Sequence, residues 1–470
     1  MNSTTETAAV AAAAPVTIAL ASWVTDLKYE DLPDSVVHQV KRLILDYYSA
    51  VIAGSTAPTS RAVQSYFAQT ESGSAAGVVG TQDRFAAHTA AFINGTAAHG
   101  LELDDGYTPG SYHPGAACLP AALAVAQAQQ SSTEDLVTAV VVAYELSCRL
   151  ARAGHPHTWQ NGFHNTGING VFGATAAVGK LLNLSQKHMA WALGMAGSFS
   201  SGLFEFLGEG SEVKRLHPGK CARDGVVVAN LAARGVDGPV TGIEGANGYF
   251  KAYAGGKAAV EGVLQDLGTT YELLKTYVKP YPCCRHLHAP MDAILAIKKQ
   301  HSFRVEDVKS VLIQTNRVAA KHAHAHYDAF LDAQMSIPYA IAVALLHDEI
   351  GLTAFNSTSR SSAAVARLVP CVSVEISEDM QAAYPVKRPA RVKVELTDGR
   401  VLSYTQDQPY GEPDNPLDDA ALTAKFRAIS DPVIGADKAQ AIAAACWALD
   451  LPAIFELTAM DPNQMVNAAD

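Results

Sequence analysis

The chain has 470 residues, of which 49% are hydrophobic and 17% charged, and this composition predicts a folded protein with a large core. Aromatic residues make up only 7% of an alanine-rich sequence, which favours closely packed helices over sheet sandwiches. The formal net charge of −11 argues against an extended basic surface, so we expect no nucleic-acid partner.

Cysteine usage and hydropathy indicate the compartment. Seven cysteines are scattered along the chain with no CxxC pair, which is typical of a reduced cytoplasmic protein. The opening MNSTTETAAVAAAAPVT lacks the basic n-region of a secretory signal, and we expect a disordered tail there. No uncharged run is both long and hydrophobic enough for a bilayer span, so we expect no membrane association.

Helical patterns fill the first part of the chain. At residues 31–54, apolar side chains recur at helical spacing before Gly54, and this predicts the first long helix. Ser132 and Glu134 stand in capping positions before another apolar run. Further helices are expected at 85–100, 120–129 and 132–154, as a pair within 168–202, and after the turn at Pro218-Gly219.

The pattern changes near residue 275. Alternating apolar and polar residues predict strands at 308–316 and 372–377, and Asp398-Gly399 between two alternating runs predicts a β-hairpin. Helical patterns are expected at 289–300, 334–348, 419–428 and 436–449.

These patterns predict a mainly α protein built in three segments. A large all-helical domain is expected at 17–275, and a smaller α+β domain at 276–408. Residues 409–470 are expected to return to the helical domain.

A polar insert, LELDDGYTPGSYHPG at residues 101–115, interrupts the alanine-rich helices. Its acids are Glu102, Asp104 and Asp105, and His113 precedes the next helix. These residues would be solvated or would cap a helix, or they would form a positioned acid and base, which a loop between buried helices can supply. The same choice between capping and function applies to His164 before a glycine-rich turn.

Basic residues gather at 209–225 in an otherwise acidic chain. Cations before a helix N-terminus suit a small anion, and the alternative is a solvated basic face. No phosphate-binding GxxxxGK[ST] motif occurs. The cluster consists of Lys214, Arg215, His217, Lys220 and Arg223.

The segment KPYPCCRHLHAPMDAI at 279–294 combines cysteines and histidines. Adjacent cysteines splay apart, and the two spaced pairs of a structural zinc site are missing, so we expect no metal here. Lys279, Arg285 and His288 are expected instead to be cationic groups for an anion.

Three histidines and a tyrosine stand out in the next segment. We expect His322, His324 and His326 to lie on an exposed, extended polar segment rather than to act as ligands. Tyr339 begins an apolar helix, where it would hold its hydroxyl in a cleft.

Taken from the residues alone, the pattern favours proton transfer. No Gx[SC]xG, HExxH or GxGxxG motif in a suitable context occurs, which disfavours hydrolases, zinc proteases and dinucleotide enzymes. Acids, histidines and a tyrosine together with basic clusters fit chemistry on a small polyanion without a cofactor, in a cleft between the two domains.

The ordered set of segments resembles the MmgE/PrpD family, which includes 2-methylcitrate dehydratases, cis-aconitate decarboxylases and iminodisuccinate epimerases. The resemblance runs from about residue 20 to about residue 450. It is carried by AHGLELDDGYTPGSYHPGAACLPAALA, NGFHNTGINGVFGATAAVGKLLNL, SEVKRLHPGKCARDGVVVANLAARGVDGP, KPYPCCRHLHAPMDAI, DAQMSIPYAIAVAL and GEPDNPLDDAALTAKF.

The resemblance implies a homodimer whose active site holds no metal or cofactor and lies between an all-α domain and a smaller α+β lid. It implies small di- or tricarboxylate substrates. The catalytic positions that it implies are His113, His164, Lys214 and Tyr339. The substrate-binding positions that it implies are Glu102, Asp104, Asp105, Arg215 and Lys279.

The expected activity is that of a hydro-lyase of the 2-methylcitrate type or of a related carbon–carbon lyase of the cis-aconitate decarboxylase type. An epimerase of an amino-dicarboxylate and a catalytically silent carboxylate-binding dimer also fit the pattern. Two departures from the family pattern bear on substrate identity. Gly106 stands where animal-type decarboxylases have threonine, and the loop to His113 is one residue longer.

Overall fold

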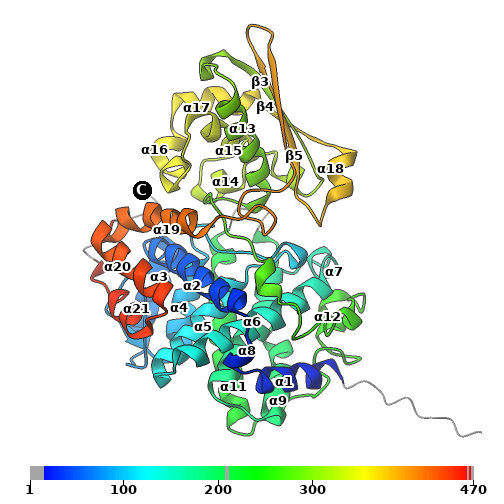
Figure 1. Cartoon of the computed structure of the whole chain (residues 1–470), viewed down its shortest axis with the longest axis vertical. Coiled ribbons are helices and arrows are strands. Elements are labelled where there is room, and N and C mark those ends of the chain that lie inside the picture. Colours follow the sequence, from blue (N-terminus) through cyan, green and yellow to red (C-terminus); the bar gives the residue numbers. More distant parts are fainter. Residues whose placement is uncertain (1–14, 207–210, 463–464, 467–470) are drawn as a thin grey trace, which may run out of the picture.

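The computed structural model describes residues 15–206, 211–462 and 465–466, and it consists of a helical body with a smaller lid above it (Figure 1). Residues 1–14 of the expected disordered tail lie outside the described residues. Among the described helices, none has the length and hydropathy that crossing a membrane requires.

The body is a bundle of helices that pack at short distances. A Cβ on Gly170 of α8 would lie 2.6 Å from the Cβ of Ala117 on α5, so only glycine permits this helix–helix contact. Ser132 caps α6 by accepting a hydrogen bond from the Asp135 backbone N–H, as the sequence predicts. The helices are α1 (Val16–Asp26), α2 (Asp34–Gly54), α3 (Pro58–Thr70), α4 (Ala87–Ala98), α5 (Pro114–Gln129), α6 (Thr133–Gly154), α7 (His157–Gln160), α8 (Asn165–Leu181), α9 (Gln186–Phe199), α11 (Leu216–Ala233) and α12 (Tyr249–Ala254).

The body departs from the sequence-based expectation in small ways. Helices α1, α3, α7 and α12 were not predicted. Helix α5 begins directly after His113, as the polar insert indicates, and so includes the residues before the apolar run expected at 120–129. A two-residue antiparallel ladder, β1 (Ala76–Gly77) with β2 (Arg84–Phe85), lies within the part expected to be all-helical.

The lid contains a four-stranded sheet in the order β4-β3-β5-β6. Strand β3 (Val308–Thr315) pairs in parallel with β4 (Val372–Ile376) and antiparallel with β5 (Ala390–Leu396). The predicted hairpin joins β5 to β6 (Val401–Gln406), and Gly399 adopts a φ of +87° that glycine tolerates best. These strands confirm the period-2 predictions.

Helices cover one face of this sheet. The alternating burial of β3 and β5 turns Val311, Ile313, Val392 and Val394 toward a core shared with α13 (His288–Gln300) and α15 (Ile337–Leu346). The helix expected at 334–348 is divided, because Ser336 caps α15 after α14 (Phe330–Met335) has ended. The remaining lid helices are α16 (Ser357–Arg360), α17 (Ala363–Leu368) and α18 (Glu378–Ala383).

The chain returns to the body after the lid. Helices α19 (Asp419–Ile434) and α20 (Ala436–Ala448) pack against α2, and α21 (Leu451–Leu457) packs against α20 (Figure 1). On α19, Lys425 pairs with the buried Asp46 and donates to the Leu103 carbonyl at 3.1 Å. The returning segment therefore helps to hold the polar insert in place. The exact domain boundaries at 275/276 and 408/409 stay predictions.

Candidate active site

A cavity between body and lid is lined by four of the nine residues that the sequence indicates for catalysis or substrate binding. The body contributes Glu102, His113, His164 and Lys214 to its wall, with Phe204 and Phe206 beside them. The lid side contributes Tyr277, Cys284, Arg285, His286, Lys321, His322, Tyr384 and Arg388. The cavity therefore combines acid/base groups with cations from two separate parts of the fold.

Glu102 is the buried anion of the body wall. Its backbone φ of 58° is one that residues other than glycine rarely adopt. Its carboxylate pairs with Lys214 through one oxygen and accepts a hydrogen bond from Lys279 at 3.0 Å through the other. Burial acts to raise the pKa of Glu102, but the two ammonium groups outweigh burial and hold it well below its usual range.

Lys279 lies behind this wall. It is fully buried and is not among the residues that line the cavity. Its ammonium group is also 3.8 Å from Asp104 Oδ1. Although burial opposes the charge, Glu102 and Asp104 raise the pKa of Lys279, so it stays protonated. Lys279 contacts Glu102 and does not line the cavity itself, and its expected substrate-binding role stays a prediction.

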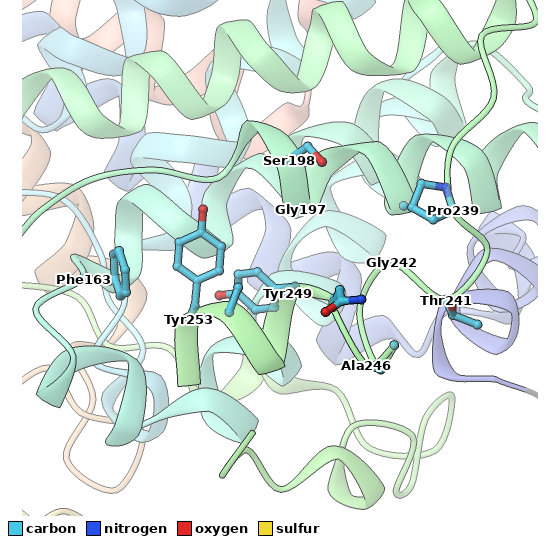
Figure 2. A pocket seen from close by; sticks show the side chains of 14 residues that line it. Phe163, Gly197, Ser198, Pro239, Thr241, Gly242, Ala246, Tyr249 and Tyr253 are labelled. Carbon is cyan, nitrogen blue, oxygen red and sulfur yellow. The ribbon is translucent and has the colours of Figure 1, made fainter. Parts of the chain in front are cut away.

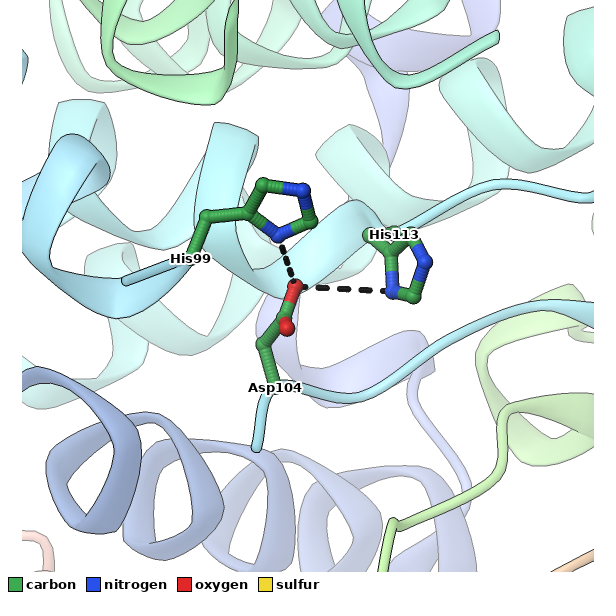
Figure 3. A group of neighbouring side chains, drawn as sticks. All are labelled: His99, Asp104 and His113. Atoms are coloured by element: carbon green, nitrogen blue, oxygen red, sulfur yellow. Dashed lines mark hydrogen bonds and ion pairs between the residues drawn. The ribbon is translucent and has the colours of Figure 1, made fainter. Parts of the chain in front are cut away.

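Asp104 joins two histidines (Figure 3). Its Oδ2 lies 2.8 Å from His99 Nδ1 and 3.4 Å from His113 Nδ1. His113 Nδ1 is also 2.7 Å from the Asp105 carbonyl oxygen, which can only accept, so Nδ1 carries the proton. The Nε2 of neutral His113 is then left as a base.

Burial and charge keep the His113 ring neutral. Burial lowers the pKa of His113 to about 3, with Lys279 acting in the same direction and Asp104 against it. For Asp104 itself, burial raises the pKa, but His99, His113 and Lys279 together hold it well below its usual range. An ionised aspartate therefore orients a neutral histidine at the edge of the cavity.

The same three side chains have the composition of a metal site. Ligand atoms of His99, Asp104 and His113 lie within 4.8 Å of one another. However, the ammonium group of Lys279 stands 3.8 Å from the same carboxylate and would repel a cation. The arrangement therefore fits a hydrogen-bonded proton network better than a metal centre.

Asp105 points away from the cavity into the body. It accepts hydrogen bonds from the Tyr144 hydroxyl and from the Gly115 backbone N–H, each at 2.8 Å. Burial raises the pKa of Asp105 to about 8, and Asp46 adds to the effect. Because Gly115 lies in the first turn of α5, Asp105 caps this helix. Its backbone carbonyl holds His113 Nδ1, and its side chain is not among those that line the cavity.

His164 brings a second histidine to the cavity from the N-terminus of α8. Its Nδ1 lies 2.9 Å from His217 Nδ1 on α11, so one of the two rings donates to the other. Burial lowers the pKa of His164 well below its usual range, and burial also lowers that of His217 to about 4. The pair can pass a proton between neighbouring rings.

Most basic side chains of the cluster at 209–225 form ion pairs with neighbouring acidic residues. Only two members of the cluster, Lys214 and His217, remain close to the cavity. Arg215 is buried and pairs with Glu212 at 2.7 Å, and Lys220 and Arg223 both pair with Asp224. Lys214 lines the cavity, and His217 reaches it through His164. Arg215 is not among the residues that line the cavity, and its expected substrate-binding role stays a prediction.

Tyr339 is not brought to the cavity. Its predicted place at the start of an apolar helix is confirmed, since it lies in the first turn of α15. Its hydroxyl, however, donates to the Ala354 carbonyl at 2.7 Å, and its ring packs against Tyr327 and Phe355 in the lid core. This geometry does not support the expected catalytic role.

The segments at 279–294 and 321–330 supply cavity residues beyond the expected cations, among them Cys284, His286 and His322. The two cysteines splay apart as expected: Cys283 Sγ faces Met291, and Cys284 Sγ lies 3.7 Å from His322 Nε2. His322 is buried at the cavity in a 3₁₀ turn, so the expected exposed strand is wrong there. Burial raises the pKa of Cys284, but His322 more than offsets this and lowers it to about 7.

Gly106 makes room for an aromatic ring. A Cβ at this position would lie 2.2 Å from Cζ of Tyr277, and the two backbones exchange hydrogen bonds of 3.1 and 2.8 Å. Tyr277 lines the cavity between body and lid. The departure from threonine at Gly106 therefore admits a tyrosine side chain, and it does not open empty space for a substrate.

A second hollow on the body surface has a different character (Figure 2). It is lined by Phe163, Tyr249 and Tyr253 and by small residues from 194–198 and 239–248, without a charged side chain. It therefore offers no acid/base set, and the cavity below the lid is the candidate active site.

Comparison with known proteins gives matches over nearly the whole chain. The MmgE/PrpD N-terminal domain matches residues 18–261 and the MmgE/PrpD C-terminal domain matches residues 281–450. A cis-aconitate decarboxylase of Aspergillus terreus is 25% identical over 93% of both chains. The human cis-aconitate decarboxylase is 26% identical over 91% of this chain and 90% of its own length. A cis-aconitate decarboxylase-like protein, oryM, of Aspergillus oryzae is 27% identical over 96% and 98%.

Proposed function

The chain belongs to the MmgE/PrpD family, and from this premise we propose that it is a lyase acting on a small di- or tricarboxylate, with decarboxylation of a cis-aconitate-like substrate as its reaction. The residues alone favour proton transfer on a small polyanion and do not choose between dehydration, decarboxylation and epimerisation. The relatives named cis-aconitate decarboxylase, matched over about nine-tenths of their length or more, are the reason for preferring decarboxylation.

The observation that carries the proposal is the body wall of the cavity. Neutral His113, oriented through Nδ1, stands in the same wall as Lys214, whose ammonium group is held by buried Glu102. Breaking the bond to a departing CO2 leaves its electron pair on carbon. A fixed ammonium group stabilises that developing charge, and a histidine can supply the proton that replaces CO2.

The protonation states suit this sequence of events. Burial keeps His113 and His164 neutral in the free protein. A polyanionic substrate beside both rings favours their charged forms, so binding would recruit a proton to the site. His217 would exchange that proton through its Nδ1 contact with His164.

Proton NMR in D2O tests the reaction directly. The protein would be incubated with cis-aconitate, citrate, 2-methylcitrate and an amino-dicarboxylate. Loss of a carboxylate carbon with incorporation of deuterium at the former attachment carbon or its allylic partner supports decarboxylation. New vinylic signals from a hydroxy acid would instead identify a hydro-lyase.

Epimerisation and silent binding have distinct signatures in the same experiment. Exchange at one α-carbon with stereochemical scrambling would identify an epimerase, and binding without turnover would identify a silent carboxylate-binding protein. The homodimer and the cytoplasmic location stay predictions. Light scattering at several protein concentrations tests the homodimer.

A further inference from the structure

The buried arginines of this chain differ in how many protein partners they have. Within the described ranges, the buried arginines are Arg149, Arg215, Arg285 and Arg388. Arg149 pairs with Glu145 and donates to four backbone carbonyls, and Arg215 pairs with Glu212. The Nε atoms of Arg215 and Arg388 are both buried without a hydrogen-bond partner. Arg215 keeps its ion pair with Glu212, whereas Arg388 makes no hydrogen bond or ion pair with any residue that the structure describes.

Arg285 lines the same cavity as Arg388, but its guanidinium group has hydrogen-bond acceptors within the protein. Both Arg285 and Arg388 line the cavity, and their guanidinium carbons lie 4.5 and 5.8 Å from the ring centre of Tyr277. Arg285 pairs with Glu412 at 3.1 Å and donates to the carbonyls of Tyr410 and Pro409. Glu412 is also the hydrogen-bond acceptor of a threonine hydroxyl, so this nearby carboxylate is already engaged.

The unsatisfied guanidinium faces the cavity with the right chemistry for an external anion. Arg388 is only 6% exposed, and a buried charge without a partner is costly unless a ligand completes it. On the body wall, by contrast, Lys214 and Lys279 are balanced by Glu102 and Asp104. The body wall therefore contributes little net positive charge to attract a polyanion.

We propose that Arg388 forms a second carboxylate subsite on the lid wall, which binds a carboxylate of the substrate other than the one that reacts at the body wall. The planar guanidinium group can donate two parallel hydrogen bonds to one carboxylate. His286 adds a second polar group, because it lines the same cavity and its buried Nδ1 has no partner.

This inference rests on the proposed function and makes it more specific. A substrate must carry at least two carboxylates to contact the body wall and the lid wall together. Because Arg388 belongs to the lid and Lys214 to the body, such a ligand would also tie the two parts of the fold to each other.

Calorimetry with unreactive ligands tests the subsite without relying on turnover. Propane-1,2,3-tricarboxylate, glutarate and butyrate would be titrated into the wild type and into R388Q, R388K and R391Q. Arg391 is the matched control, since it lies three residues further on, in β5, and already pairs with Asp379 at 2.7 Å. We expect R388Q to weaken tricarboxylate binding by about 10- to 100-fold, the range for losing a hydrogen bond to a charged group.

The remaining variants and ligands sharpen the expected pattern. R388K should bind with intermediate affinity, R391Q like the wild type, and the preference for glutarate over butyrate should largely disappear in R388Q. Ligand-free R388Q should melt at or above the wild-type temperature, because it loses an unpaired buried charge. In turnover, R388Q should raise KM far more than it lowers kcat.

The failures of the two proposals are distinguishable. If the wild type neither binds nor turns over any polycarboxylate, both the proposed function and the Arg388 subsite are wrong. If the wild type binds the tricarboxylate and R388Q keeps the same dissociation constant, only the Arg388 subsite is wrong. If R388Q does not fold, R388K provides the test. An R388K protein with the tricarboxylate affinity and KM of the wild type would refute the proposed bidentate contact between Arg388 and a carboxylate.

Discussion

The two walls of the cavity differ in whether their buried charged groups are paired within the protein. On the body wall, every ionised group of the polar insert has a partner of opposite charge, and Glu102 alone serves both Lys214 and Lys279. On the lid wall, Arg285 is saturated by protein acceptors, while Arg388 has none among the described residues.

The difference separates two tasks that one cavity must perform. A network that is complete before the ligand arrives keeps a histidine and an ammonium group in fixed positions, which is what preorganised catalysis requires. A charge without a partner gains its interaction only when an anion binds, which suits recognition. The following variants test whether the two walls differ in this way.

Removing the shared anion of the body wall should have the largest effect. E102Q leaves the buried ammonium groups of Lys214 and Lys279 without their main partner, and breaking a buried pair costs about 3–5 kcal/mol. We expect a lower free energy of unfolding in urea titrations, together with loss of activity. E395Q, which removes the surface partner of Lys309, should leave unfolding nearly unchanged. Equal stability of E102Q and wild type would contradict the network described for the body wall.

Removing the oriented base should affect rate rather than stability. We expect H113N to lower kcat by about 10²- to 10⁴-fold, the usual contribution of a general acid or base, with little change in the melting temperature. H347N, at an exposed position, is the control and should behave like the wild type. The role of His113 would be refuted by a variant with wild-type turnover on whichever substrate reacts.

Filling the space beside Gly106 should strain the junction between the walls. G106T places a Cβ 2.2 Å from Tyr277 Cζ, and overpacking of this kind costs about 1–3 kcal/mol. We expect a lower melting temperature and a higher KM. The double variant G106T/Y277L should recover stability relative to G106T. A Cβ at Gly351 meets no atom within 4 Å, so G351A should be close to neutral.

The smallest effect concerns the thiol on the lid wall. Alkylation of Cys284 by iodoacetamide, followed by peptide mass spectrometry, should rise with pH around a midpoint near 7, because the paired imidazolium of His322 stabilises the thiolate. In H322Q the midpoint should move upward, since that stabilisation is lost while burial remains. Cys283 is an internal control: burial holds its pKa well above the usual range, so it should stay unmodified. An unchanged midpoint in H322Q would show that the two side chains are not coupled.

Local patterns in the sequence were enough to predict much of the architecture. The Asp398-Gly399 hairpin, the alternating strands and the helix beginning after His113 all depend on contacts within a few residues, which periodicity and turn chemistry record. The polar insert was identified for the same reason, because charged residues between alanine-rich helices stand out without any knowledge of the fold.

The partners of those charged residues could not be predicted in the same way. Lys214 and Lys279 both look like free cations in sequence, yet they meet the carboxylate of Glu102 across 112 and 177 positions. Tyr339 and Arg215 resemble site residues, but local packing turns one into the lid core and pairs the other with Glu212. No local pattern marks Arg388, since its significance lies in having no partner.

By itself, then, the sequence determined the helices, the strands and the family of this protein, and it located the insert that bears His113. Only the tertiary structure decided which charges cancel and which remain open to a ligand. The physical reason is that secondary structure responds to neighbours along the chain, whereas an ion pair depends on the distance between groups that folding brings together. The residues of a site that depends on ion pairing can therefore be identified in the sequence, but which of them pair with each other cannot.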